Sequence, residues 1–274
     1  MSLAPHLLVT GGLEGAGEGD VVPMADAARH HLHRVLRLAE GARLSLTDGS
    51  GRSGDAVLVE VGARLVGPVV VATPLTPRLV LAQALSKGRR AEDAVRAACE
   101  LGVDRLVPVV AARTQGRPDE RAEAAIVARW ESVAVAALEQ SRGVWRAEVT
   151  RPVGVDVLVA GTPDALRLVA VPGAPALPSV VGEARPVEVV VAVGPEGGWA
   201  PDELAAFCSA GWRSVGLGPS VLRTEHAGPV AVAVVAALLG RWGSERPAGG
   251  VGAPGATLRG PSVEEPRPPV SGPL

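Results

Sequence analysis

The sequence predicts an α/β protein in which a domain with a mostly parallel sheet follows a small β-rich module. Three observations lead to this prediction. From about Arg78 onward, short apolar runs alternate with segments that carry apolar residues at helical spacing. Before that point, short strand-like runs are separated by turn-forming residues. After Gly243 the chain becomes rich in Pro and Gly and poor in large apolar residues.

The N-terminal module is expected to span residues 1–74. The cluster Asp48-Gly49-Ser50-Gly51 is typical of a turn between strands. One helix is expected over Ala25–Arg37. The strands are expected at His6–Val9, Arg43–Thr47, Asp55–Val61 and Val69–Ala72.

The second domain is expected to span residues 75–243 and to be followed by a disordered tail, residues 244–274. Its first strand lacks polar alternation, which is typical of a strand buried on both faces. Strands are expected at Arg78–Leu85, Asp104–Val110, Leu166–Val171, Val187–Val193 and Ser214–Leu217. Helices are expected at Ala91–Leu101, Glu120–Ser141, Pro201–Ala210 and Thr224–Arg241.

Composition restricts the class of protein. The 274 residues are 47% apolar, enough for a sizeable core, and the net charge of −2 argues against a generally nucleic-acid-binding surface. Two distant cysteines in apolar stretches, Cys99 and Cys208, indicate reduced, buried thiols. No signal peptide is recognisable, and the longest apolar run, Val230–Leu239, is too short to span a bilayer. We therefore expect a cytoplasmic protein with no membrane partner.

The segment Val193–Trp199, with the sequence VGPEGGW, closes one of the expected buried strands. Its three glycines surround the carboxylate of Glu196 and allow a ligand to approach the backbone closely. Ligands of open α/β sheets bind at the carboxyl ends of strands, where this segment lies. A ligand-binding loop and an ordinary Gly-rich turn both remain open. The spacing matches neither a dinucleotide fingerprint nor a Walker loop.

A second strand-to-helix turn, Leu217–Ala227, has the sequence LGPSVLRTEHA. Leu217, Val221 and Leu222 are suited to wall an apolar slot for a flat base. Glu225 falls in the first turn of the following helix, where the helix dipole favours a carboxylate by roughly 0.3–1 kcal/mol. The alternative is that the Thr-Glu pair only caps the helix.

Three polar segments are weaker indications. Lys87-Gly88-Arg89-Arg90 joins a strand to a helix and suits phosphate binding at a helix N-terminus, or is a solvated loop. The stretch Glu139–Gly143, which closes the long helix, indicates little by itself. His30–Arg37 holds three histidines, but no Cys or acidic residue has the spacing for zinc, so no metal is expected. We expect this helix to present His and Arg to RNA phosphates, with a solvated helix as the alternative.

In this order, these segments resemble the RsmE-type family of 16S ribosomal RNA uridine-N3 methyltransferases. The resemblance covers roughly residues 25 to 241. Its most specific part is Gly-Pro-Glu-Gly-Gly followed, about twenty residues later, by Leu-Gly-x-x-x-Leu-Arg-Thr-Glu. The matching stretches are His31–Arg37, Asp48–Gly51, Lys87, Glu100–Val103, Glu139–Ser141, Gly194–Gly198 and Leu217–Glu225.

The resemblance implies a SPOUT methyltransferase domain with a C-terminal trefoil knot and an N-terminal PUA-like β-barrel that binds RNA. It also implies S-adenosyl-L-methionine (SAM) as the cofactor, 16S ribosomal RNA or the small ribosomal subunit as the partner, and a homodimer. The cofactor-binding candidates are Val171, Gly194, Pro195, Glu196, Gly197, Gly198, Leu217, Gly218, Val221 and Leu222. The catalytic candidates are Arg223, Glu225 and Glu196. The RNA-binding candidates are His31, Arg34, Arg37, Lys87, Arg90 and Arg113.

A mechanism follows from the chemistry of uracil, whose N3 carries a proton at neutral pH and must lose it before it attacks a methyl group. Arg223 is the first candidate for stabilising the developing uracil anion. Glu196 or Glu225 would take the proton or hold Arg223 by a bidentate contact. The target base must also be unpaired or flipped out of its helix.

Other functions remain open beside this one. Another SPOUT RNA methyltransferase, acting on a ribose 2′-hydroxyl or a different base, would share the fold and the cofactor. A non-catalytic RNA-binding protein is a second alternative. The sequence departs from the family pattern at Ala97, Ser220 and His226, and Arg96 is the nearest cation to the first of these. Ser220 bears on the RNA target, because a cation usually stands there.

Overall fold

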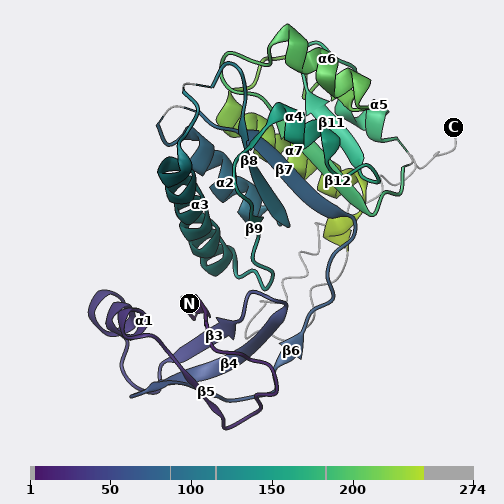
Figure 1. Ribbon diagram of the computed structural model, residues 1–274. Coiled ribbons are helices and arrows are strands. Elements are labelled where there is room, and N and C mark those ends of the chain that lie inside the picture. The colour runs from purple at the N-terminus through teal and green to yellow at the C-terminus, as the bar shows by residue number, and fades with distance from the viewer. Residues whose placement is uncertain (1–3, 87, 115, 183, 244–274) are drawn as a thin grey trace, which may run out of the picture.

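The structure, a computed structural model, describes residues 4–243 except 87, 115 and 183. The described strands form two sheets, one built from residues 6–71 and one from residues 78–215 (Figure 1). The expected tail, residues 244–274, lies outside the described residues. No helix in the described part of the chain is long and apolar enough to cross a membrane.

The first sheet has the strand order β1-β3-β4-β5-β2, with β6 beside β4. β1 is parallel to β3 and the other pairs are antiparallel. Leu44, Leu46, Leu58 and Leu65 fill its core together with Leu32. No pair between β1 and β2 closes the path into a ring among the described strands. The strands are β1 (His6–Leu8), β2 (Val21–Pro23), β3 (Arg43–Thr47), β4 (Arg52–Val59), β5 (Gly62–Leu65) and β6 (Val70–Val71).

The helix expected over Ala25–Arg37 is shorter and is divided in two. It consists of α1 (Asp26–His30) and a π-helical turn, η1 (His31–Val35). Arg37 then takes a left-handed conformation with φ 53°, which ends the helix. The prediction omitted β2 and β5, because three and four residues are too few to show a period.

The second sheet has the order β10-β8-β7-β12-β11-β13, with β9 beside β8, and all its pairs are parallel. The expected parallel sheet is confirmed. The strands are β7 (Arg78–Ala84), β8 (Arg105–Val110), β9 (Glu148–Val149), β10 (Val153–Gly154), β11 (Leu166–Ala170), β12 (Glu188–Val193) and β13 (Arg213–Val215). The short β9 and β10 were not predicted.

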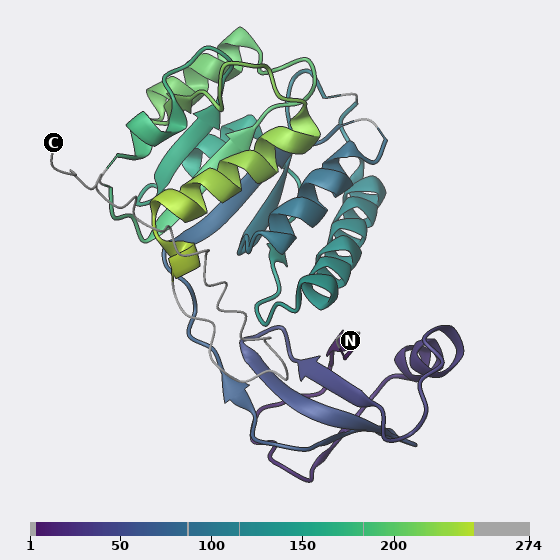
Figure 2. The same cartoon turned by 180° about the vertical axis from the view of Figure 1, so that it is seen from behind.

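Helices cover both faces of this sheet. Leu79 and Leu81 of β7 pack under α2, α3, α5 and α7 on one face, whereas Val80 and Ala82 pack under α4 and α6 on the other. Figure 2 shows α7 lying across the first of these faces with α2 and α3 beside it. The helices are α2 (Arg90–Glu100), α3 (Glu120–Ser141), α4 (Val155–Ala160), α5 (Leu177–Val181), α6 (Pro201–Ser209), α7 (Thr224–Leu238) and the 3-10 turn η2 (Arg241–Gly243).

The C-terminal end of the described chain is anchored by a buried arginine. The sequence predicted one helix as far as Arg241, but α7 ends at Leu238 and Arg241 belongs to η2. Its guanidinium lies 2.7 Å from the Asp104 carboxylate and donates to the Gly102 carbonyl at 2.9 Å. It also donates to the carbonyl oxygen of Pro77. These contacts bind the last turn to the linker between the sheets.

The two cysteines are free, as predicted, but only one of them is shielded. Burial raises the pKa of the Cys99 thiol to about 12. Cys208 is exposed, so the prediction that it is buried was wrong. It lies on α6, and the buried contact of this helix is made by neighbouring Phe207 instead.

The end of α3 docks the first sheet onto the second. The imidazole of His6 in β1 is hydrogen-bonded to Ser45 at 2.9 Å and to the carbonyl of Gly143 at 2.8 Å. Burial lowers the pKa of His6, which keeps this ring neutral. Glu139 accepts the amide N–H of Leu8 at 3.0 Å. The segment Glu139–Gly143, which had no assigned role in the sequence, therefore contributes contacts between the sheets.

Candidate functional site

Three loops meet at the carboxyl edge of the second sheet. They follow β12, β11 and β13, which are adjacent in the strand order. The amide of Gly216 donates to the carbonyl of Pro175 at 2.8 Å, and the amide of Leu177 donates to the carbonyl of Gly216 at 2.9 Å. A side chain at Gly216 would place its Cβ 2.4 Å from the carbonyl oxygen of Ala174. The loop that begins at Val171 is therefore in direct contact with Gly216, which leads into the loop that begins at Leu217.

The Gly-rich loop after β12 turns sharply between the strand and α6. The amide of Gly198 donates to the carbonyl of Pro195 at 2.8 Å, and Gly198 has φ +68°, a conformation that favours glycine. A Cβ at Gly194 would lie 3.2 Å from the Trp199 ring, so this backbone packs on the indole. A Cβ at Gly198 would meet nothing within 4 Å, which leaves the backbone there open to a ligand.

One side chain joins this loop to the start of α7 and to the central strand. Thr224 donates from Oγ1 to the carbonyl of Gly194 at 2.9 Å and accepts from Nε2 of Gln83 at 2.9 Å. Thr224 is buried. The N-cap of α7 is Arg223, without a side-chain cap, so the alternative that the Thr-Glu pair only caps this helix is wrong. Thr224 connects two loops and β7 instead.

The side chains of Arg223 and Glu225, at the start of α7, lie in different environments. The Arg223 side chain is 79% exposed and the Glu225 side chain 13% exposed, and their nearest atoms, Nη1 and Oε1, are 3.9 Å apart. This is an ion-pair distance, and the expected bidentate contact is not present. Oε2 of Glu225 is buried and has no hydrogen-bond partner among the described residues. The pair thus combines a solvent-facing cation with a shielded carboxylate.

Two arginines that the sequence assigned to RNA hold the Gly-rich loop. Arg90, at the start of α2, lies 2.9 Å from the Glu196 carboxylate. Arg113, in the loop after β8, donates to the carbonyl of Gly197 at 2.6 Å. Glu196 therefore pairs with Arg90. Lys87 lies outside the described residues.

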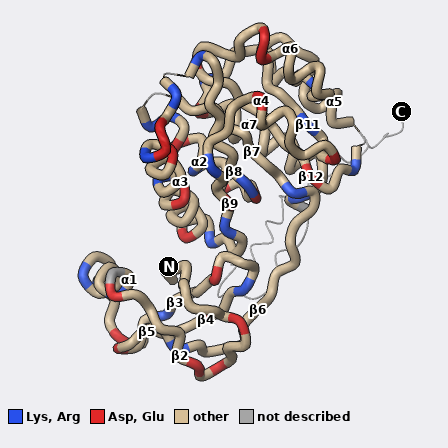
Figure 3. The backbone as a smooth tube through the Cα atoms, viewed as in Figure 1, with Lys and Arg blue, Asp and Glu red and all other residues tan. Residues whose placement is uncertain are grey.

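The other RNA-binding candidates lie elsewhere. His31 and Arg34 are exposed on η1, and Arg37, which follows it, is exposed as well. Figures 1 and 2 place α1 at the outer end of the first sheet. The ends of α3 and α7 contact the first sheet and the linker, at one edge of the second sheet. The Gly-rich loop lies at the opposite edge of the second sheet, remote from the first sheet (Figure 1). Figure 3 marks Lys and Arg positions in both regions.

Two residues of this edge were missed by the sequence reasoning. Gln83 is fully buried, and it is the only polar residue inside an otherwise apolar strand after Arg78, a pattern that would have identified it. Glu203 is buried and accepts the amide N–H groups of Ala112 and Ala200, each at 2.7 Å. It fixes the start of α6 to the loop after β8. Its position at N3 of a helix with Pro at N1 was the available indication.

Family models match both parts of the chain. A model described as an RNA methyltransferase domain matches residues 73–236, and one described as an RNA methyltransferase PUA domain matches residues 25–66. A Synechocystis protein named ribosomal RNA small subunit methyltransferase E is 33% identical over 226 residues, covering 80% of this chain and 73% of its own length. A Mycobacterium bovis protein of the same name is 35% identical over 232 residues, covering 77% and 84%.

Solved structures agree with these matches. A Legionella pneumophila protein in complex with the bound cofactor SAM superimposes with a TM-score of 0.78 at 28% identity, covering 86% of this chain and 98% of its own. A ribosomal RNA small subunit methyltransferase E from Neisseria gonorrhoeae, bound to S-adenosyl methionine, gives a TM-score of 0.77 at 27% identity with the same coverage. The fold of the chain is therefore the fold of SAM-bound proteins.

Proposed function

The chain belongs to the family of RNA methyltransferases that includes the ribosomal RNA small subunit methyltransferases E, and from this we propose that it methylates N3 of one uridine in 16S ribosomal RNA. The observation that carries the proposal is the meeting of three loops at one sheet edge beside Arg223 and Glu225. A relative with this name and this fold is solved with SAM bound. The methyl donor is therefore SAM.

The loops of this chain fit such a cofactor. A Cβ at Gly198 or Gly218 would meet nothing within 4 Å, so the backbone of two loops is open to a ligand. Gly-rich backbone without side chains lets the polar groups of SAM approach these loops closely. When bound, SAM supplies a methyl group activated by its sulfonium. The residues proposed to hold it are Val171, Gly194, Pro195, Glu196, Gly197, Gly198, Leu217, Gly218, Val221 and Leu222.

Arg223 and Glu225 are proposed to have two different roles in the reaction of the uracil. Loss of the N3 proton leaves negative charge on the ring, and an exposed guanidinium at the loop edge is placed to stabilise that charge. The shielded Glu225 carboxylate, with one oxygen lacking a partner, is the proton acceptor. Glu196 has a different role from these two, because its carboxylate is engaged by Arg90. We propose that it holds the Gly-rich loop in place.

The RNA contacts are proposed to come from both parts of the chain. The first sheet, which the PUA model matches in part, carries His31, Arg34 and Arg37 on and beside η1. Arg90 and Arg113 stand beside the Gly-rich loop, with part of their charge used within the protein. Lys87 completes the proposed set. Exposed cations on both sheets suit an extended RNA surface with a locally basic path.

The finer architecture is part of the same proposal. We propose a SPOUT domain over residues 75–243 with a C-terminal trefoil knot, a PUA-like barrel over residues 1–74 and a tail from residue 244. A parallel bridge between Ala176 and Gly216, which extends the pairing of β11 with β13, brings two of the proposed knot loops together. A homodimer in the cytoplasm completes the proposal. Light scattering that gives a monomer mass at every concentration tested would contradict the dimer.

The proposed function can be tested in living cells. Ribosomal RNA from a strain lacking this gene is compared with RNA from the parent strain for methylated uridines. We expect one uridine of 16S ribosomal RNA to lose an N3 methyl group and to regain it when the gene is restored. Loss of a ribose 2′-O-methyl group instead would favour the alternative reaction within the same fold. An unchanged pattern would contradict both.

A further inference from the structure

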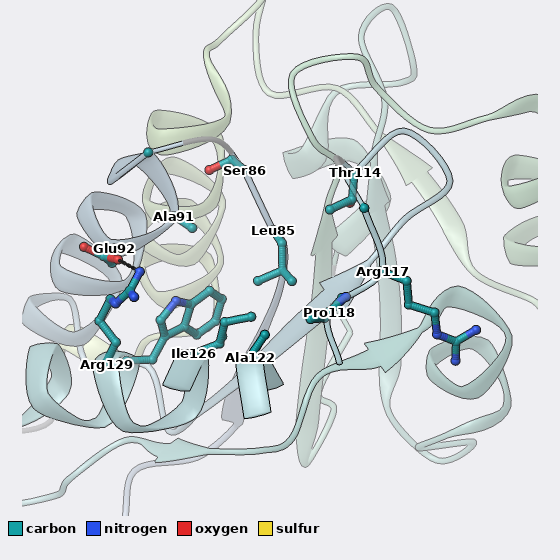
Figure 4. A pocket seen from close by; sticks show the side chains of 13 residues that line it. Leu85, Ser86, Ala91, Glu92, Thr114, Arg117, Pro118, Ala122, Ile126 and Arg129 are labelled. Atoms are coloured by element: carbon teal, nitrogen blue, oxygen red, sulfur yellow. Dashed lines mark hydrogen bonds and ion pairs between the residues drawn. The ribbon is translucent and has the colours of Figure 1, made fainter. Parts of the chain in front are cut away.

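A pocket lies beside the Gly-rich loop and is not used by the reaction proposed above. It has a volume of about 440 Å³ and opens between the starts of α2 and α3 and the loops after β7 and β8. Figure 4 shows Leu85, Ala122 and Ile126 pointing into it, and buried Trp130 lines it as well. This volume falls within the range of small-ligand sites in proteins.

The two loops that line the pocket contact the Gly-rich loop of the proposed cofactor site. Arg90 follows the pocket residue Gly88 and pairs with Glu196 at 2.9 Å. Arg113 precedes the pocket residue Thr114 and donates to the carbonyl of Gly197 at 2.6 Å. A molecule in the pocket would therefore lie next to the Gly-rich loop, separated from it by this pair of contacts.

The polar groups of the pocket fit a nucleotide. Arg117 lies at the rim between this pocket and a second one lined by Glu123 and Asp156, and Figure 4 shows its side chain extending away from the apolar walls. Its charge is thus available to a phosphate outside the pocket. Oγ of Ser86 is buried without a partner, which leaves a hydroxyl for a polar base edge. The Glu92 carboxylate is neutralised by Arg129 at 3.1 Å and Arg89 at 3.8 Å.

We propose that this pocket binds one nucleotide of the substrate RNA that flanks the methylated uridine. The base packs against Leu85 and Ile126, and its phosphate faces Arg117. The occupant is a flanking nucleotide and not the target, because neither Arg223 nor Glu225 lines the pocket. This inference rests on the proposed function, since it requires an RNA substrate, and it adds a determinant of RNA sequence or shape to it.

The test fills the pocket without touching the proposed cofactor loops. Ala122→Trp places an indole into the pocket from α3, and Ala124→Trp adds the same side chain at an exposed position of the same helix. Both variants are compared with the wild type in steady-state methylation of small ribosomal subunits, in SAM calorimetry and in thermal melting. We expect Ala122→Trp to raise KM for the subunits about tenfold, because the base loses its contacts with Leu85 and Ile126, with unchanged SAM affinity. Ala124→Trp is expected to match the wild type.

A second pair of variants covers the case in which Ala122→Trp fails to fold. Arg117→Ala is expected to raise KM and to reduce its dependence on salt, whereas Arg121→Ala, an exposed arginine on α3, should do neither. Equal KM values within each folded pair overturn the pocket inference. A pocket variant whose mass in light scattering differs from that of the wild type also overturns it, because the pocket would then be a contact between copies of the chain. Wild-type protein that methylates no small subunit overturns the proposed function itself, and the pocket inference with it.

Discussion

The hydroxyl of Thr224, at the start of α7, donates a 2.9 Å hydrogen bond to the carbonyl oxygen of Gly194, at the end of β12. The same hydroxyl accepts from Gln83 of β7 at 2.9 Å. Thr224→Val keeps the shape but removes both bonds, which leaves the buried Gln83 amide with only a 3.5 Å hydrogen bond to the carbonyl of Ala84. We expect a loss of roughly 1–3 kcal/mol in the free energy of unfolding and weaker SAM binding. Thr224→Ser, which keeps the hydroxyl, should stay near the wild type in denaturant unfolding and calorimetry, and equal behaviour of the two variants would refute this link.

The Gly-rich loop offers a second prediction. A Cβ at Gly197 would lie 3.3 Å from the Arg113 side chain, so Gly197→Val forces this arginine or the loop to move. We expect calorimetry to detect no SAM binding to the folded variant, because the loop backbone no longer presents the same surface. Gly67→Val, at a position with nothing within 4 Å, is the matched control and should bind SAM normally. Unchanged affinity in folded Gly197→Val would remove this loop from the cofactor site.

Loss of Arg223 should produce a different kind of defect from loss of the residues beside it. Its side chain is 79% exposed, so Arg223→Ala should not alter stability or SAM affinity. We expect single-turnover methylation at saturating RNA and SAM to slow by roughly a hundredfold or more, as the loss of one preorganised donor does. Arg223→Lys should restore only part of the rate, because an ammonium cannot form two parallel hydrogen bonds. A near-normal rate for Arg223→Ala would transfer the main catalytic role to Glu225.

The bounds of individual helices and strands could be predicted from the sequence, whereas most side-chain partners could not. The long helix Glu120–Ser141 and the strand Arg43–Thr47 have the predicted bounds, because local period and turn residues determine them. Local patterns carry no record of which distant residues meet. The pair Arg90 and Glu196, 106 positions apart, and the contact of Glu139 with Leu8 depend on tertiary packing alone. The sequence therefore located the loops, and the structure assigned partners to their side chains.

The end of the folded chain provides a fourth prediction. The Arg241 side chain is 3% exposed and contacts Asp104 and the linker before β7. A protein ending at Gly243 should keep its melting temperature and methylation rate, whereas Arg241→Ala should lose roughly 3 kcal/mol or more of stability because a buried charge pair is broken. Trp242→Ala, at a side chain that is 54% exposed, is the control. A large loss on removing residues 244–274 would show that the tail packs on the folded part.

The central claim, transfer of a methyl group to uracil N3, is tested most directly by nucleoside analysis. Purified protein is incubated with SAM carrying an isotopically labelled methyl group and with small ribosomal subunits from a strain lacking the gene. The 16S ribosomal RNA is then digested to nucleosides and analysed by mass spectrometry, with Arg223→Ala as the matched control. We predict labelled 3-methyluridine at one position, formed by the wild type and nearly absent with the variant. Label in a 2′-O-methyl nucleoside or another base, or no label in active, SAM-binding protein, would contradict the claim.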